Sequence, residues 1–82
     1  MNVQVDAVRE FVAESFRDDL GIVLPSGEAD FFEELGVDSL AYLNVISRVE
    51  RRFGVHFELE VLPLLRTRDA LAGAVLERIG AG

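Results

Sequence analysis

The chain has 82 residues, half of them hydrophobic, with no cysteine and a formal net charge of −7 at pH 7. This length predicts one small domain over residues 1–82 with a modest core, and the missing cysteines exclude disulfides and thiolate metal sites. The negative charge argues against a nucleic-acid partner, and the apolar runs are too short to span a membrane, so a cytoplasmic protein is expected.

The first predicted element is a helix over residues 3–19. Its apolar residues, such as Val12 and Phe16, recur on one face, and its charged residues lie largely on the other. Asn2 is a candidate N-cap, and Gly21 is a stop signal just past the last turn. The segment therefore reads as a helix with one face toward the core.

A long connection over residues 20–38 follows the first helix. Connections of this length are unusual in a compact domain unless they are functional or packed by their own side chains. Phe31, Phe32 and Leu35 are suited to such packing. We expect both phenylalanines to belong to the core, because they are large and apolar.

The strongest amphipathic pattern spans residues 39–53 and predicts the second main helix, which Gly54 ends. Ser39 then lies in the first turn, where the positive end of the helix macrodipole favours a phosphate group. The apolar residues of this helix recur at steps of three and four and predict one apolar stripe, made of Leu40, Leu43, Ile46, Val49 and Phe53.

The last part of the chain predicts two further helices. A short one is expected at 59–65, where Pro63 fits only the first turn or the edge. Thr67 is a suitable N-cap for a third main helix over residues 68–79, and residues 80–82 are expected to be a frayed tail. The pattern is thus all-α, with three main helices plus one short helix.

Residues 36–40 read Gly-Val-Asp-Ser-Leu, and this stretch resembles the modification site of acyl carrier proteins, whose signature is G-x-D-S-L. The match begins at Phe31, runs on through Phe53-Gly54-Val55, and continues more loosely from Thr67 to Ile79. The resemblance covers most of the chain. It implies an acyl-carrier-like bundle with a long loop after the first helix.

The resemblance also implies roles for the motif residues. In acyl carrier proteins the serine, here Ser39, bears 4′-phosphopantetheine through a phosphodiester, and the preceding residue, here Asp38, is part of what the phosphopantetheinyl transferase recognises. Gly36 allows a tight approach to the helix, and Leu40 contacts a partner or the arm. Judged by residue type alone, these residues also have purely structural roles open to them. Asp38 and Ser39 are preferred helix caps, Gly36 is a common turn residue, and Leu40 is suited to the core.

The second helix also suggests how partner enzymes dock. Its exposed side is arginine-rich, whereas carriers of fatty-acid synthesis are strongly acidic there, so we expect partners that dock by apolar contact and by acids facing these arginines. Tyr42 either touches the arm or a docked enzyme or is an isolated exposed aromatic, and the arginines are otherwise a solvated face. The expected partner-binding residues are Leu40, Tyr42, Asn44, Arg48, Arg51, Arg52, Glu33 and Glu34.

No residue pattern points to an enzyme or to a metal site, and the only histidine, His56, has no plausible catalytic partner. The resemblance therefore implies a discrete carrier, expected to be a monomer. A phosphopantetheinyl transferase would activate it, and acyltransferase, ligase or synthase enzymes would load and unload an acyl or aminoacyl thioester.

The cargo is less closely defined by the sequence. The motif resembles acyl carriers, whereas peptidyl carriers usually show two glycines before the serine. Two stretches resemble polyketide and nonribosomal-peptide carriers more than fatty-acid ones, namely Asp30-Phe31-Phe32-Glu33 and the arginine-rich end of the second helix, from Arg48 to Phe53. Polyketide or hybrid secondary metabolism is therefore expected. The alternatives are a carrier of fatty-acid synthesis and a helical interaction module that carries nothing.

Overall fold

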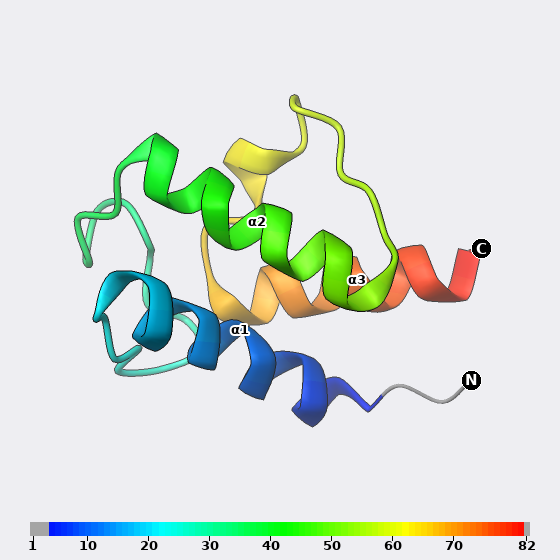
Figure 1. Cartoon of the computed structure of the whole chain (residues 1–82), viewed down its shortest axis with the longest axis horizontal. Coiled ribbons are helices and arrows are strands. Elements are labelled where there is room, and N and C mark those ends of the chain that lie inside the picture. Colours follow the sequence, from blue (N-terminus) through cyan, green and yellow to red (C-terminus); the bar gives the residue numbers. More distant parts are fainter. Residues whose placement is uncertain (1–3, 82) are drawn as a thin grey trace.

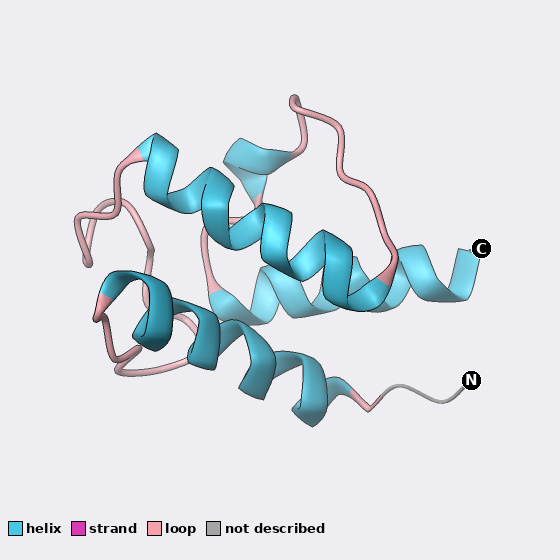
Figure 2. Cartoon of the chain, in the orientation of Figure 1, coloured by secondary structure: helices cyan, strands magenta, loops and turns pink. Residues whose placement is uncertain are grey.

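The computed structural model describes residues 4–81, which form three α-helices and one short 3₁₀-helix, η1, and contain no strand (Figure 2). In chain order these are α1 (Val5–Leu20), α2 (Ser39–Phe53), η1 (Leu62–Leu64) and α3 (Arg68–Ala81). In Figure 1, α1 runs in the opposite direction to α2 and α3, and it packs against both. Within this part of the chain, every helix is too short or too polar for a transmembrane span. The predicted all-α fold is confirmed.

The ends of α1 differ slightly from the prediction of residues 3–19. The helix begins at Val5, and Gln4 before it has extended backbone and makes no side-chain cap. Asn2, the candidate cap, lies outside the described residues. Gly21 ends the helix as predicted, because its left-handed backbone lets its N–H donate to the carbonyl of Arg17 at 3.0 Å.

One core joins the three helices and the long loop, residues 21–38, that lies at the N-terminal end of α2 (Figure 1). Phe31 of this loop is fully buried, and its ring stacks on that of Phe16 in α1 with 4.4 Å between centroids. Phe32 is half-buried against the same core. Phe31 therefore belongs to the core as expected, whereas Phe32 packs against the edge of the core and is not part of its buried residues. The fully buried apolar residues are Val8, Val12, Phe16, Phe31, Val45, Val49, Leu71, Ala72 and Val75.

The predicted apolar stripe along α2 is not buried at its N-terminal end. Leu40 and Leu43 are 76% and 40% exposed, although Ile46 and Val49, further along the same stripe, are buried. The reason is that, in the first turns of α2, it is Tyr42 that points to the core, together with the buried residues that follow it on the same helical face. Two overlapping helical faces are apolar here, and periodicity does not distinguish them.

The C-terminal elements also shift. The short helix was predicted at 59–65 but is confined to Leu62–Leu64, because a turn precedes it in which the Val61 N–H donates to Glu58. Pro63 occupies its first turn as predicted. Helix α3 continues to Ala81, so the predicted frayed tail is wrong for the described part of residues 80–82.

The left-handed backbone conformation of the glycine that ends α2 can be tested by measuring the stability of variants. Replacing Gly54 (φ 65°) by alanine is expected to destabilise the fold by about 1–2 kcal/mol, because a Cβ disfavours left-handed backbone. The same change at Gly73, inside α3 where a Cβ would meet open space, is expected to stabilise it by about 1 kcal/mol. Urea unfolding followed by circular dichroism measures both. Shifts of the same sign would contradict the assigned conformations.

Candidate functional site

Ser39 is the first residue of α2 and is exposed. Before it, Asp38 has extended backbone, and its carboxylate accepts a hydrogen bond from the Ala41 N–H at 2.9 Å. Gly36 has left-handed backbone with φ 67°, and its N–H donates to the carbonyl of Phe32 at 3.2 Å. The loop thus turns tightly and leaves a serine hydroxyl at a helix N-terminus, where the backbone dipoles favour an anion.

The acidic turn before the motif is organised by Asp30. Its carboxylate accepts hydrogen bonds from the N–H groups of Phe32 and Glu33, both at 2.8 Å. The Glu34 carboxylate in return accepts from the Asp30 N–H at 3.2 Å. This reciprocal pattern resembles a capping box, except that the returning carboxylate lies four residues after Asp30 and not three. The Glu34 carboxylate is therefore hydrogen-bonded within the turn, whereas the side chain of Glu33 is largely exposed.

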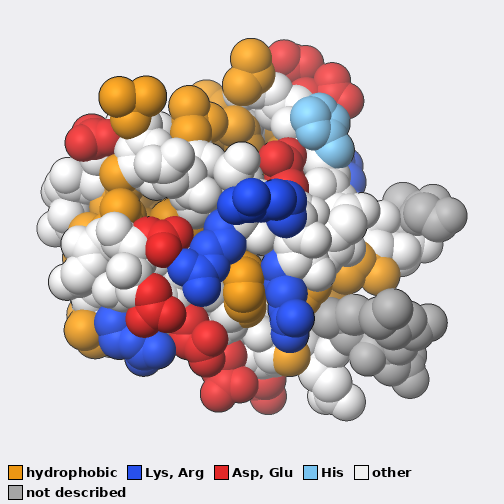
Figure 3. Space-filling model, in the orientation of Figure 1, with side chains coloured by type: hydrophobic (Ala, Val, Ile, Leu, Met, Phe, Trp, Pro, Cys, Tyr) orange, Lys and Arg blue, Asp and Glu red, His pale blue; other side chains and the backbone are white. Residues whose placement is uncertain are grey.

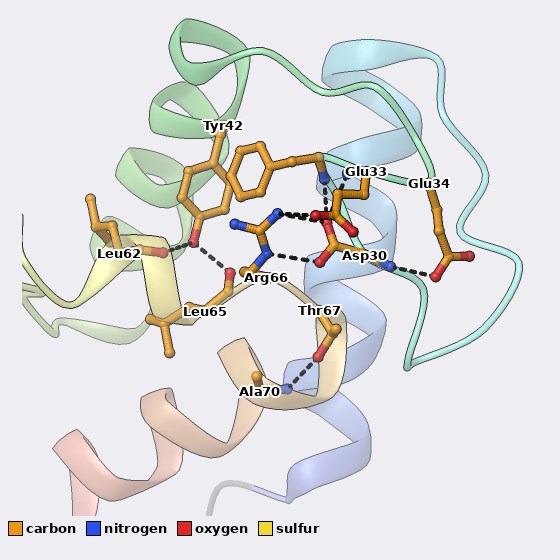
Figure 4. A network of polar contacts seen from close by, with 10 residues as sticks. Asp30, Glu33, Glu34, Tyr42, Leu62, Leu65, Arg66, Thr67 and Ala70 are labelled. Atoms are coloured by element: carbon orange, nitrogen blue, oxygen red, sulfur yellow. Dashed lines mark hydrogen bonds and ion pairs between the residues drawn. The ribbon is translucent and has the colours of Figure 1, made fainter.

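Arg66, which follows η1, fastens this turn from across the fold (Figure 4). Its Nε and Nη2 donate to the two carboxylate oxygens of Asp30 at 2.8 and 3.3 Å, and its guanidinium lies 4.9 Å from the ring centroid of Phe32. The hydrogen bond from Arg66, helped by those from the backbone, lowers the pKa of Asp30 to about 2.

Tyr42 is not the exposed aromatic that the sequence allowed. Its side chain is 3% exposed, and its hydroxyl lies 2.7 Å from the carbonyl oxygen of Leu65 and 3.1 Å from that of Leu62. Burial raises the pKa of this hydroxyl well above its ordinary value, so it remains a donor. Tyr42 therefore ties η1 to α2 and is unsuited to direct contact with a docked enzyme.

A groove of about 340 Å³ opens beside Ser39, between α2 and the segment around η1. Its polar lining comes from Ser39, Tyr42 and Arg66. Its size lies at the lower end of the range for ligand pockets. In a long, flexible group attached to the Ser39 oxygen, the first atoms would lie at the anion-favouring end of α2, and the atoms further along would reach this groove. The apolar lining consists of Phe32, Leu43, Leu59, Leu62 and Pro63.

The residues expected to bind partners lie in different environments. Leu40 stands out from the surface, and Asn44, Arg51 and Arg52 are also exposed. Arg48 is half-buried, and its guanidinium pairs with an acid of α1. Figure 3 shows hydrophobic side chains gathered along the upper edge of the molecule and basic and acidic ones intermixed across the middle of the same face.

The sequence reasoning missed three residues of this region. Leu59 and Leu64 are each about three-quarters exposed, and Leu59 lines the groove beside Ser39. Arg66 lines the groove with Ser39. The one available signal for Arg66 was a single cation at the end of an apolar run, which does not reveal which acid it meets.

Comparison with known proteins agrees with this geometry. Residues 10–75 match the family described as "Phosphopantetheine attachment site". The chain is 35% identical over 74 residues to the anthracycline acyl carrier protein DauA of Streptomyces sp. (strain C5), covering 90% of this chain and 88% of that protein. It is 37% identical over 71 residues to the phosphinothricin tripeptide synthetase PhsC of Streptomyces viridochromogenes, covering 87% of this chain but 6% of that protein.

A solved structure is similar over the whole chain. The 3-oxo-butyl acyl carrier protein from the actinorhodin polyketide synthase of Streptomyces coelicolor superposes with a TM-score of 0.68 and 25% identity, covering 100% of this chain and 96% of that one. The chain therefore belongs to the phosphopantetheine attachment family, the acyl carrier proteins. Proteins of this family carry 4′-phosphopantetheine and act as carriers rather than catalysts, with synthases and transferases as their partners.

The Asp30 ion pair predicts a pH dependence. Folding lowers the pKa of Asp30 from 3.8 to about 2, so the pair stabilises the folded state above about pH 4 and is lost as the pH falls toward 2. In Asp30→Asn this contribution is absent, and the urea midpoint is expected to fall less than that of the wild type between pH 5 and pH 2. Parallel pH profiles for the two proteins would contradict this origin of the shift.

Proposed function

We propose that Ser39 carries the phosphopantetheine and that the chain, as one carrier domain and a monomer, presents acyl or aminoacyl groups to biosynthetic enzymes in the cytoplasm. The observation that carries this is the exposed Ser39 hydroxyl at the N-terminus of α2, beside a groove, in a member of this family. When attached, the group supplies the thiol that holds the cargo as a thioester, since the chain has no cysteine. The chain itself catalyses nothing.

The neighbouring residues have supporting roles in this proposal. Asp38 fixes the first turn of α2 through its bond to the Ala41 N–H, and it also presents a carboxylate to the transferase. Gly36 allows the tight approach. Leu40, which is exposed next to Ser39, offers the apolar contact that an approaching enzyme buries.

We further propose a polyketide cargo. The support is the similarity to a carrier named for anthracyclines and to one from the actinorhodin synthase. The similarity to a peptide synthetase supports an aminoacyl group as the second candidate. Fatty-acid synthesis fits less well, because Glu50, the only acid of α2, is turned inward and accepts from the Phe57 N–H at 2.8 Å.

The proposed docking surface combines apolar and charged parts. Partners bury Leu40 and place carboxylates opposite Arg51 and Arg52. Glu33 and Glu34 face cations of the partner, with Glu33 the more available of the two, because the Glu34 carboxylate also accepts a hydrogen bond from the Asp30 N–H. Arg48 contributes less, because its guanidinium already lies 2.7 Å from a carboxylate of α1. Docking is weak and brief, since each partner must release the carrier. The enzymes are a phosphopantetheinyl transferase and the acyltransferases, ligases or synthases that load and unload the thiol.

Intact mass after incubation with coenzyme A and a broad-specificity phosphopantetheinyl transferase tests the attachment. The wild type is expected to gain one phosphopantetheine, and Ser39→Ala to gain none. Ser47→Ala is the matched control, because Ser47 is also an exposed serine of α2. No gain in folded wild type with several transferases, or gain in Ser39→Ala, would overturn the proposal and favour an interaction module.

The role of Leu40 is tested by the rate of the same reaction. Leu40→Ala is expected to lower kcat/KM of the transferase roughly tenfold, equivalent to about 1.4 kcal/mol, because an apolar contact is lost. Val23→Ala is the control, since Val23 is 75% exposed and Leu40 is 76% exposed, but Val23 lies in the loop after α1. Equal effects of the two changes would argue against a specific contact at Leu40.

A further inference from the structure

The guanidinium of Arg66 is hydrogen-bonded along one edge and, among the described residues, leaves its third nitrogen, Nη1, open. Its Nε and Nη2 are bonded to the Asp30 carboxylate, and Nη2 also approaches Glu33 at 3.9 Å. Within residues 4–81, no hydrogen bond or ion pair is made by Nη1. Figure 4 shows this remaining nitrogen pointing away from the carboxylates and toward Tyr42. Tyr42 and Arg66 both line the groove beside Ser39, so the open edge faces that groove.

The other polar groups along the groove are already used. The Tyr42 hydroxyl is bound to the carbonyl oxygens of Leu62 and Leu65. The Ser39 oxygen is the proposed attachment point. Arg66 therefore supplies the hydrogen-bond donor that an otherwise apolar groove offers to a bound group. A charged donor beside apolar walls forms a stronger hydrogen bond than it does in bulk water.

We propose that Arg66 is a positioning residue for the phosphopantetheine arm, holding it along the groove by donating from Nη1 to an oxygen of the arm. The inference rests on the proposed attachment at Ser39. The arm carries phosphate, hydroxyl and amide oxygens, all of which are acceptors, while its carbon atoms suit the apolar walls. Asp30 takes part indirectly, because its two oxygens fix the plane of the guanidinium.

An arginine suits this task better than a lysine. The planar fork binds Asp30 with one edge and keeps the opposite edge directed at the groove, whereas an ammonium group has no fixed second direction. Arg66→Lys keeps the charge and the attraction to Asp30 but removes the second directed donor. Arg66→Met removes both the charge and the donors while keeping an unbranched side chain.

The matched control is Arg48→Met. Arg48 and Arg66 have 34% and 38% exposed side chains, and their guanidinium groups pair with carboxylates at 2.7 and 2.8 Å, respectively. Each also lies over a phenylalanine ring. Arg48 does not line the groove beside Ser39. The two arginines thus differ mainly in what their guanidinium groups face.

The experiment loads wild type, Arg66→Lys, Arg66→Met and Arg48→Met with isotopically labelled phosphopantetheine and checks loading by intact mass. NMR then measures the ¹H–¹⁵N NOE of the amide groups of the arm and the shift changes of Tyr42 and Leu62 between the apo and loaded forms. The phosphorus-31 shift of the phosphodiester tells whether the phosphate or the pantetheine part is the acceptor. Circular dichroism checks that each variant is folded. If Arg66→Met is unfolded, the comparison of Arg66→Lys with the wild type decides the outcome.

In the wild type and Arg48→Met we expect a restrained arm and shift changes at the groove. In Arg66→Lys and Arg66→Met both effects are expected to be lost. A fully mobile arm in the loaded wild type, a restrained arm in Arg66→Lys, or the same loss in Arg48→Met would overturn the inference. Failure to load the wild type would instead overturn the attachment at Ser39, and this inference with it.

Discussion

Burial of Phe31 beneath the start of α2 is the constraint on which the rest of the site depends. Its ring stacks on Phe16 of α1 and lies 5.9 Å from that of Tyr42 in α2, so one side chain joins two helices. Its N–H also donates to the carbonyl of Arg66 at 2.8 Å. The side chain and the backbone of Phe31 are therefore both fixed. From Phe31 the chain continues to the start of α2, where Ser39 lies at the surface.

The side chains around the site consequently fall into two kinds. The Tyr42 hydroxyl and the Asp30 carboxylate are bonded within the fold and hold the loop and η1 in place. Ser39 and Leu40 are exposed on the rim that this arrangement creates. A carrier needs such a division, because its attachment point must keep one geometry while a succession of enzymes binds and leaves.

The charge that a partner meets is also set by packing. Three of the eight basic residues lie near the end of α2, but Arg48 is drawn to the Asp19 carboxylate of α1. Glu50 is turned inward to the Phe57 N–H. Within residues 4–81, Arg51 and Arg52 make no ion pair, so their charges remain on the exposed side of α2, while the acidic turn lies before the helix. In the docking that we propose, this separation of charge orients a partner as well as attracting it.

The sequence by itself determined the local features of this protein, namely the three main helices, the caps at Asp38 and Thr67, and the serine at the start of α2, because these depend on residues a few positions apart. Only the tertiary structure decided that Leu40 is exposed and Tyr42 buried, since both belong to apolar faces of one helix. It also decided that Arg66 meets a carboxylate 36 positions earlier and lines the groove. Such contacts join distant segments, and periodicity and capping patterns carry no information about them.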